Sequence, residues 1–75
     1  MSVKKLDMLS PGQWAVVYRV ENSPIQRRLE QLGFTKGERV CRMYTDRSGF
    51  LSAYRIENSL IALRRTDAES VLVQI

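Results

Sequence analysis

The sequence predicts a mainly β protein, a small barrel of about five antiparallel strands with one inserted α-helix and a short helical turn before the last strand. Segments rich in β-branched and aromatic residues recur along the chain, and short turn-like stretches separate most of them. Such short strands with tight connections favour a small barrel, because curling the sheet protects its edges. The expected strands are Trp14–Val20, Glu38–Tyr44, Phe50–Ile56, Leu60–Arg64 and Val71–Ile75.

One segment between the first two strands has the pattern of a helix. The apolar residues Ile25, Leu29 and Leu32 are spaced i, i+4 and i+7, which places them on one helical face. Ser23-Pro24 precedes them, with serine as the expected N-cap and proline at the first helical position. Gly33 follows as the expected C-cap. A helix of about nine residues is marginal alone, so we expect its apolar face to dock on the barrel.

A second helical signal is shorter. Thr66 and Glu69 are three residues apart, as in a capping box, and Asp67 and Ala68 lie between them. This pattern predicts a single helical turn immediately before the last strand.

Composition excludes several classes of function. The chain has 75 residues, no histidine and one cysteine. We therefore expect one domain over residues 1–75, with no Ser-His-Asp or Cys-His catalytic site and no Cys/His zinc site. No phosphate-binding glycine loop is present. We predict a protein that is not an enzyme, with no cofactor and no metal site inferred from its residues. A lone cysteine fits a reducing compartment, and Cys41 itself is expected to be a small buried side chain.

The charge balance indicates an acidic partner or simply a well-solvated surface. Twelve basic and eight acidic residues give a net charge of +4, and nine of the basic residues are arginine. Arginine favours bidentate contacts with carboxylates and phosphates. The adjacent pairs Arg27-Arg28 and Arg64-Arg65 could form such a clamp, or could be solvated or paired within the domain. Residue patterns alone leave both alternatives open.

Three motifs in succession carry a resemblance to a known family. They are Leu9-x-Pro11-Gly12-Gln13, then Arg28-Leu29-x-x-Leu32-Gly33-Phe34-x-x-Gly37-x-x-Val40, and finally Ile61-Ala62-Leu63-Arg64-Arg65-x-x-Ala68 followed by Val71-x-Val73. Together they cover roughly residues 6–75, and the chain resembles the FeoA family. The loop Asp46–Phe50 departs from the family's pattern, because it lacks both prolines of the usual Pro-Leu-Gly-Asp-Pro stretch.

The resemblance implies an SH3-like barrel and an accessory role in ferrous iron uptake. The implied partner is the cytosolic part of a membrane ferrous iron permease that carries a G-protein domain. The protein would then be cytoplasmic, without stable membrane insertion, and recruited to the inner face of the membrane by that partner. The main alternative is a small nucleic-acid-binding barrel that stacks bases on exposed aromatic side chains. A weaker alternative is recognition of proline-rich peptides in an aromatic-lined groove.

The expected partner-binding surface combines the helix end, the turn after it, one hairpin loop and the arginine pairs. The spacing of Leu29, Leu32 and Phe34 favours packing of the helix on the barrel core. Phe34 would instead anchor the partner-binding surface if its side chain is exposed. The candidates are Arg27, Arg28, Leu32, Phe34, Thr35, Lys36, Gly37, Arg47, Ser48, Arg64 and Arg65.

Overall fold

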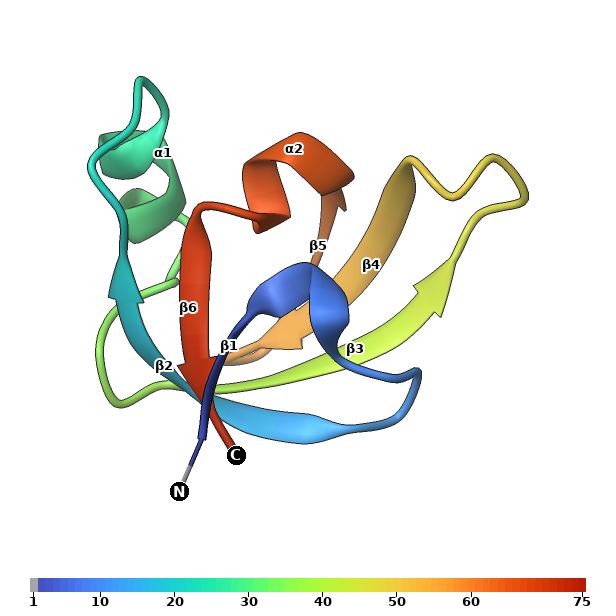
Figure 1. Ribbon diagram of the computed structural model, residues 1–75, viewed down its shortest axis with the longest axis horizontal. Coiled ribbons are helices and arrows are strands. Elements are labelled where there is room, and N and C mark those ends of the chain that lie inside the picture. The colour runs from blue at the N-terminus through green and yellow to red at the C-terminus, as the bar shows by residue number, and fades with distance from the viewer. Residues whose placement is uncertain (1) are drawn as a thin grey trace.

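The computed structural model describes residues 2–75, which form an antiparallel sheet with three short helical segments (Figure 1). In chain order the elements are β1 Val3–Lys5, the 3-10 helix η1 Leu6–Met8, β2 Trp14–Val20, α1 Gln26–Gln31, β3 Arg39–Thr45, β4 Leu51–Ile56, β5 Ser59–Arg64, α2 Arg65–Ala68 and β6 Val71–Gln74. The predicted mainly β class, the inserted helix and the short helical turn before the last strand are confirmed. Within the described residues, no helix is long and apolar enough to cross a membrane.

The strands form one curled sheet in the order β1-β6-β2-β3-β4-β5. All neighbouring strands are antiparallel, and hydrogen bonding does not close the sheet, since β1 and β5 are its two edges. The sixth strand, β1, was not predicted. It is three residues long and exposed, and it pairs Val3 with Gln74 and Lys5 with Leu72. So short a segment carries no alternating pattern, and only its pairing with β6 makes it a strand.

The core lies inside the curl of the sheet. Strand alternation supplies most of it, because every second side chain on a strand points to the same face. Leu6 and Leu9, at 0% and 1% exposure, come from the N-terminal segment and cover one end. The other buried members of the cluster are Ala15, Val17, Val20, Leu29, Phe34, Val40, Tyr54, Ile56, Leu63, Ala68, Val71 and Val73.

Helix α1 begins later than predicted. Its N-cap is Ile25, and the Gln26 N–H donates to the Ser23 carbonyl oxygen at 3.1 Å, so Ser23 opens a turn before the helix. The Ser23 hydroxyl is buried and has no hydrogen-bond partner among residues 2–75. The expected serine cap is therefore wrong, because α1 begins only at Gln26 with Ile25 as its N-cap.

The C-terminal end of α1 is a Schellman motif. The Phe34 N–H donates to Leu29 O at 3.1 Å, and the Gly33 N–H donates to Glu30 O at 3.1 Å. Gly33 has φ +112°, a conformation that only glycine adopts readily. The motif brings the Phe34 and Leu29 side chains together in the core. The predicted role of Gly33 in ending the helix is thus confirmed. The C-cap itself is Leu32, and Gly33 is the residue that follows it.

Helix α2 forms where it was predicted, but without the expected capping box. Arg64 is its N-cap, and no side chain caps it. The Arg65 N–H donates to Phe50 O at 2.7 Å. This hydrogen bond extends the pairing of β4 with β5 by one residue beyond each strand. Because the chain passes directly from strand to helix, Thr66 already lies inside the helix and cannot act as its N-cap.

Candidate partner-binding site

A groove of about 290 Å³ runs between helix α1 and the β5 edge of the sheet. Its walls come from one face of α1, from the start of β4, from the second half of β5 and from Asp67 in α2. The lining residues are Ile25, Arg28, Leu29, Leu32, Leu51, Ala62, Leu63, Arg64 and Asp67.

The floor of the groove is apolar. Leu29 and Leu63 are almost fully buried, at 1% and 6% exposure, while Ile25 and Leu32 are half-buried and pack against the core. The helical spacing of Ile25, Leu29 and Leu32 explains why all three reach the same side of α1. One helical face therefore serves two purposes, since its inner part completes the core and its outer part lines the groove.

Arginine side chains form the rim of the groove. Arg28 on α1 and Arg64 at the end of β5 are both exposed. The Arg64 Nε lies 3.2 Å from Asp67 Oδ2, in an ion pair whose arginine side chain is 70% exposed. Exposed pairs of this kind contribute about 0–1 kcal/mol, so Asp67 restrains Arg64 only weakly. An apolar centre with a basic rim is suited to a partner surface that is apolar and acidic.

The structure brings Arg28, Leu32 and Arg64 together in this groove, as three of the predicted site residues. Arg27 is exposed on α1 beside Arg28 but does not line the groove. The turn Thr35–Gly37 is also exposed, and its backbone is held by β2, because the Gly37 N–H donates to Val17 O at 2.9 Å. Lys36 Nζ lies 5.9 Å from the centre of the Tyr18 ring.

Arg47 and Ser48 lie in the β3–β4 hairpin, which projects on the opposite side of the molecule from α1 in Figure 1. The Ser48 hydroxyl donates to Asp46 Oδ1 at 2.7 Å, and the Gly49 N–H donates to the same oxygen at 3.0 Å. The Ser48 hydrogen bond holds the pKa of Asp46 below its usual 3.8. Ser48 therefore organises its own loop, apart from the groove.

Phe34 is not a surface anchor. Its side chain is fully buried, at 0% exposure, because the Schellman motif turns it inward against Leu29. Phe34 was expected to bind a partner only if its side chain is exposed, and it is not. Its position in the core, the alternative, is the correct one.

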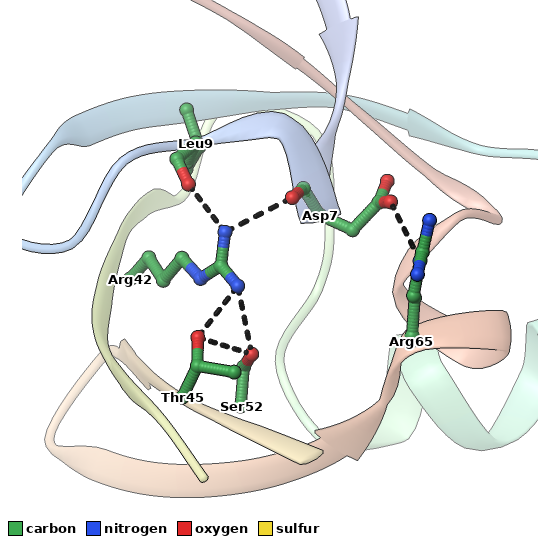
Figure 2. A network of polar contacts seen from close by, with 6 residues as sticks. All are labelled: Asp7, Leu9, Arg42, Thr45, Ser52 and Arg65. Carbon is green, nitrogen blue, oxygen red and sulfur yellow. Dashed lines mark hydrogen bonds and ion pairs between the residues drawn. The ribbon is translucent and has the colours of Figure 1, made fainter. Parts of the chain in front are cut away.

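Arg65 faces away from the groove, toward the N-terminal segment. Its Nε lies 3.9 Å from Asp7 Oδ2, so the pair Arg64-Arg65 does not form a single clamp (Figure 2). Arg64 and Arg65 instead reach different carboxylates, Asp67 and Asp7.

Sequence reasoning missed a polar network around Arg42 (Figure 2). Its guanidinium donates to the carbonyl oxygens of Asp7 and Leu9, at 3.0 and 2.6 Å, and to the hydroxyls of Thr45 and Ser52. Arg42 thereby ties the segment around η1 to β3 and β4. The sequence did indicate that Arg42 faces inward, because it is two residues from inward-facing Val40 on the same strand. Strand alternation alone does not predict which groups an inward-facing arginine binds.

A hollow of about 190 Å³ lies beside this network. Tyr54 contributes to its lining, and burial raises the pKa of the Tyr54 hydroxyl above its usual 10.0. Cys41 is buried, as predicted, and its thiol lies 3.6 Å from Arg42 O. In residues 2–75, no three His, Cys, Asp or Glu side chains gather into a group that could hold a metal ion.

The fold and the groove define a class of protein, a small antiparallel β domain with an apolar, arginine-rimmed groove. The FeoA domain model matches residues 4–75, and the chain therefore belongs to the FeoA family. No protein of curated function matches the sequence.

Solved structures of family members agree with this assignment. FeoA of Stenotrophomonas maltophilia is 34% identical, with a TM-score of 0.82 over 92% of this chain and 87% of that chain. That protein was solved in complex with zinc and is described as an SH3 domain protein and a candidate activating factor for ferrous iron transport. FeoA of Chlorobium tepidum is 30% identical, with a TM-score of 0.87 over 95% of this chain and 69% of that chain.

More distant structures share the fold alone. A manganese-dependent transcriptional repressor is 15% identical, with a TM-score of 0.86 over 96% of this chain and 41% of that chain. The SH3-like fold thus occurs both as a small protein and as part of a longer one, which says nothing about the function of this chain.

Proposed function

We propose that this protein is a cytoplasmic interaction module that binds the cytosolic part of a ferrous iron permease and alters its assembly or activity. The groove between α1 and β5 carries the proposal, because it joins a half-buried apolar floor to an exposed arginine rim. Apolar surface at the centre with charge at the edge is typical of protein interfaces. Family membership supplies the process, ferrous iron transport. The protein would act by binding, without catalysis.

Two other candidate regions would contribute at the periphery. The turn Thr35–Gly37 and the hairpin residues Arg47 and Ser48 are exposed but lie outside the groove. We assign them to secondary contacts that position the partner, while the groove supplies most of the binding free energy, since buried central contacts usually dominate an interface.

The proposal is tested by placing a charge in the groove. Leu32→Arg should abolish binding to the purified cytosolic part of the permease, measured by titration calorimetry, because it puts a cation on the apolar floor. Tyr44→Arg is the matched control, since Tyr44 is 60% exposed on β3 and does not line the groove. Both variants must give folded, dispersed NMR spectra. Equal affinity of folded Leu32→Arg and wild type would refute the groove as the binding site.

A second candidate function is nucleic-acid binding by the outer face of the sheet. Trp14 is 44% exposed there, and the Arg39 guanidinium lies over its ring at 4.7 Å from the centroid. Aromatic rings beside arginines can stack with bases. This function predicts a steep loss of affinity with salt and loss of binding in Trp14→Ala. Absence of a gel shift with single-stranded oligonucleotides at low salt would eliminate it.

A further inference from the structure

Strand β5 is an open edge of the sheet, and it borders the groove. It pairs with β4 and with no other strand among residues 2–75. Three consecutive residues of β5 line the groove, namely Ala62, Leu63 and Arg64. Ala62 and Arg64 lie on one face of the strand, and Leu63 lies on the other. The groove therefore follows the edge of the strand itself, with α1 as its far wall.

The backbone groups on this edge can be assigned from the hydrogen-bond pattern. In an antiparallel pair, residues bonded to the neighbouring strand alternate with residues whose N–H and C=O point away from it. The Arg65 N–H donates to Phe50 O, so every second residue back from Arg65 bonds toward β4. The N–H and C=O groups of Ala62 and Leu60 consequently point to the open side. No turn or side-chain hydrogen bond within residues 2–75 uses these groups.

The two edges of the sheet differ in how they are protected. Edge strands that avoid pairing are usually short, carry lysine or proline, or contain a bulge. Strand β1 has three residues and includes Lys4 and Lys5. Strand β5 has six residues, contains neither lysine nor proline, and keeps an unbroken register with β4. Leu60 on this edge is also 51% exposed. The β5 edge thus has none of these features, and its one charged side chain, Arg64, lies at its C-terminal end.

We propose that a partner binds β5 as an added strand, through an extended segment in which apolar residues alternate and acidic residues flank them. This inference rests on the proposed function and specifies its geometry. Backbone bonds to Ala62 and Leu60 would supply the register, and alternate apolar side chains would enter the groove. Acidic side chains would meet Arg28 and Arg64, the latter held by Asp67 only through its Nε.

An extended segment fits this edge better than a helix does. A helix pairs its own backbone groups and could fill only the apolar floor, which would leave the Ala62 and Leu60 groups without protein partners. An added strand satisfies these backbone groups and the floor together. The basic rim favours a segment of another protein over a second copy of this chain. A second β5 would bring another Arg64 to a rim that is already positively charged.

Amide hydrogen exchange tests the proposal directly. The ¹⁵N-labelled protein is measured by NMR alone and with the purified cytosolic part of the permease. We expect the Leu60 and Ala62 amides to exchange at least about tenfold more slowly in the complex, because each becomes a hydrogen-bond donor. Binding that leaves both exchange rates unchanged would overturn the added strand but not the proposed function. Failure to bind at all would overturn both.

Proline substitution provides a second measurement. Ala62→Pro removes the outward N–H and leaves the bonds to β4 in place, since edge strands tolerate proline whose missing N–H faces outward. Ala62→Thr is the matched control, because it retains the N–H and suits a strand. We expect Ala62→Pro to weaken binding about tenfold or more and Ala62→Thr by less than about threefold. Equal affinity of the two folded variants would contradict the proposal.

Should Ala62→Pro fail to fold, the exchange measurement on the wild-type protein decides. Protection of Leu60 and Ala62 that is already present in the free protein and grows with its concentration would assign the edge to a second copy. That result would overturn the proposed partner segment.

Discussion

Arg42 shows how a single inward-facing charge can organise a small β protein. Its guanidinium satisfies the carbonyl oxygens of Asp7 and Leu9 and the hydroxyls of Thr45 and Ser52 (Figure 2). The segment between β1 and β2 has little regular structure, so these bonds and the buried Leu6 and Leu9 hold it against the sheet. The five donors of arginine make this possible, whereas lysine could reach only some of the same acceptors.

Arg42→Ala should lower the free energy of unfolding by about 2–4 kcal/mol, because carbonyl oxygens lose a charged donor in a partly buried setting. Urea denaturation measures the change. Arg55→Ala is the matched control, since Arg55 is an exposed arginine on the neighbouring strand and should change stability by less than about 0.5 kcal/mol. Equal stabilities of the two variants would show that the network contributes nothing.

Asp46 gives a pH dependence confined to the β3–β4 hairpin. The Ser48 hydroxyl is the main cause of its lowered pKa, and backbone N–H groups of the loop add to it. Since the carboxylate is the form favoured in the folded loop, its stabilising bonds are present above the ordinary pKa of 3.8 and are lost as the pH falls through the lower, folded value.

We therefore expect the Gly49 and Leu51 amide resonances to titrate with a midpoint below pH 3.8 in an NMR series. Ser48→Ala should move this midpoint upward, because the main hydrogen bond to the carboxylate is gone. A midpoint at or above 3.8 in the wild type would contradict the assignment. Ser2→Ala, far from the loop in sequence, should leave the midpoint unchanged.

At the scale of elements, the end of α1 decides where both the core and the groove lie. The Schellman motif at Gly33 turns Phe34 back onto Leu29, while Leu32 stays at the border between core and groove. The two apolar residues that flank Gly33, Leu32 and Phe34, thus have different roles because of one backbone conformation. Without that turn, the chain could not leave the helix and enter β3 with Phe34 buried.

Gly33→Ala should lower the free energy of unfolding by about 1–3 kcal/mol, because a φ of +112° is strained for alanine. Space is not the obstacle, since the new Cβ would lie 3.4 Å from the flexible Glu57 side chain. Thermal unfolding followed by circular dichroism measures the loss. Gln31→Ala, an exposed helical control, should be neutral or slightly stabilising. No difference between the variants would argue against a strained turn.

At the scale of the whole molecule, the excess of arginine affects association more than folding. The net charge of +4 and the basic rim would attract an acidic partner. Dissolved salt screens this attraction and shortens the distance over which it acts. Opposite charges mainly speed the encounter of two proteins, while apolar contacts slow their separation.

Raising NaCl from about 50 to 300 mM should therefore reduce the association rate with the permease fragment about tenfold and change the dissociation rate far less. Stopped-flow fluorescence separates the two rates. Arg28→Gln should show a weaker salt dependence. Arg55→Gln removes an exposed charge that does not line the groove and should match the wild type. A salt effect carried mostly by dissociation would contradict this description of the rim.

Local pattern was enough to predict most of the elements. Alternation and turn residues placed β2 to β6, helical spacing placed α1, and the glycine at its end was predicted correctly. The errors lie where local rules competed with packing. Ser23 and Thr66 both match N-cap patterns, yet Ser23 lies in the turn before α1 and Thr66 lies within α2. A cap depends on where the preceding chain comes from, which a sequence window does not contain.

The sequence by itself determined the class of fold and the family, because these depend on periodicity and motifs. Only the tertiary structure decided which candidates lie together in one groove. It joined Arg28 and Leu32 to Arg64, more than thirty residues away, and it separated Arg64 from adjacent Arg65. The physical reason is that curling of the sheet sets which strand edge faces the helix, and this depends on long-range pairing that no local stretch of residues encodes.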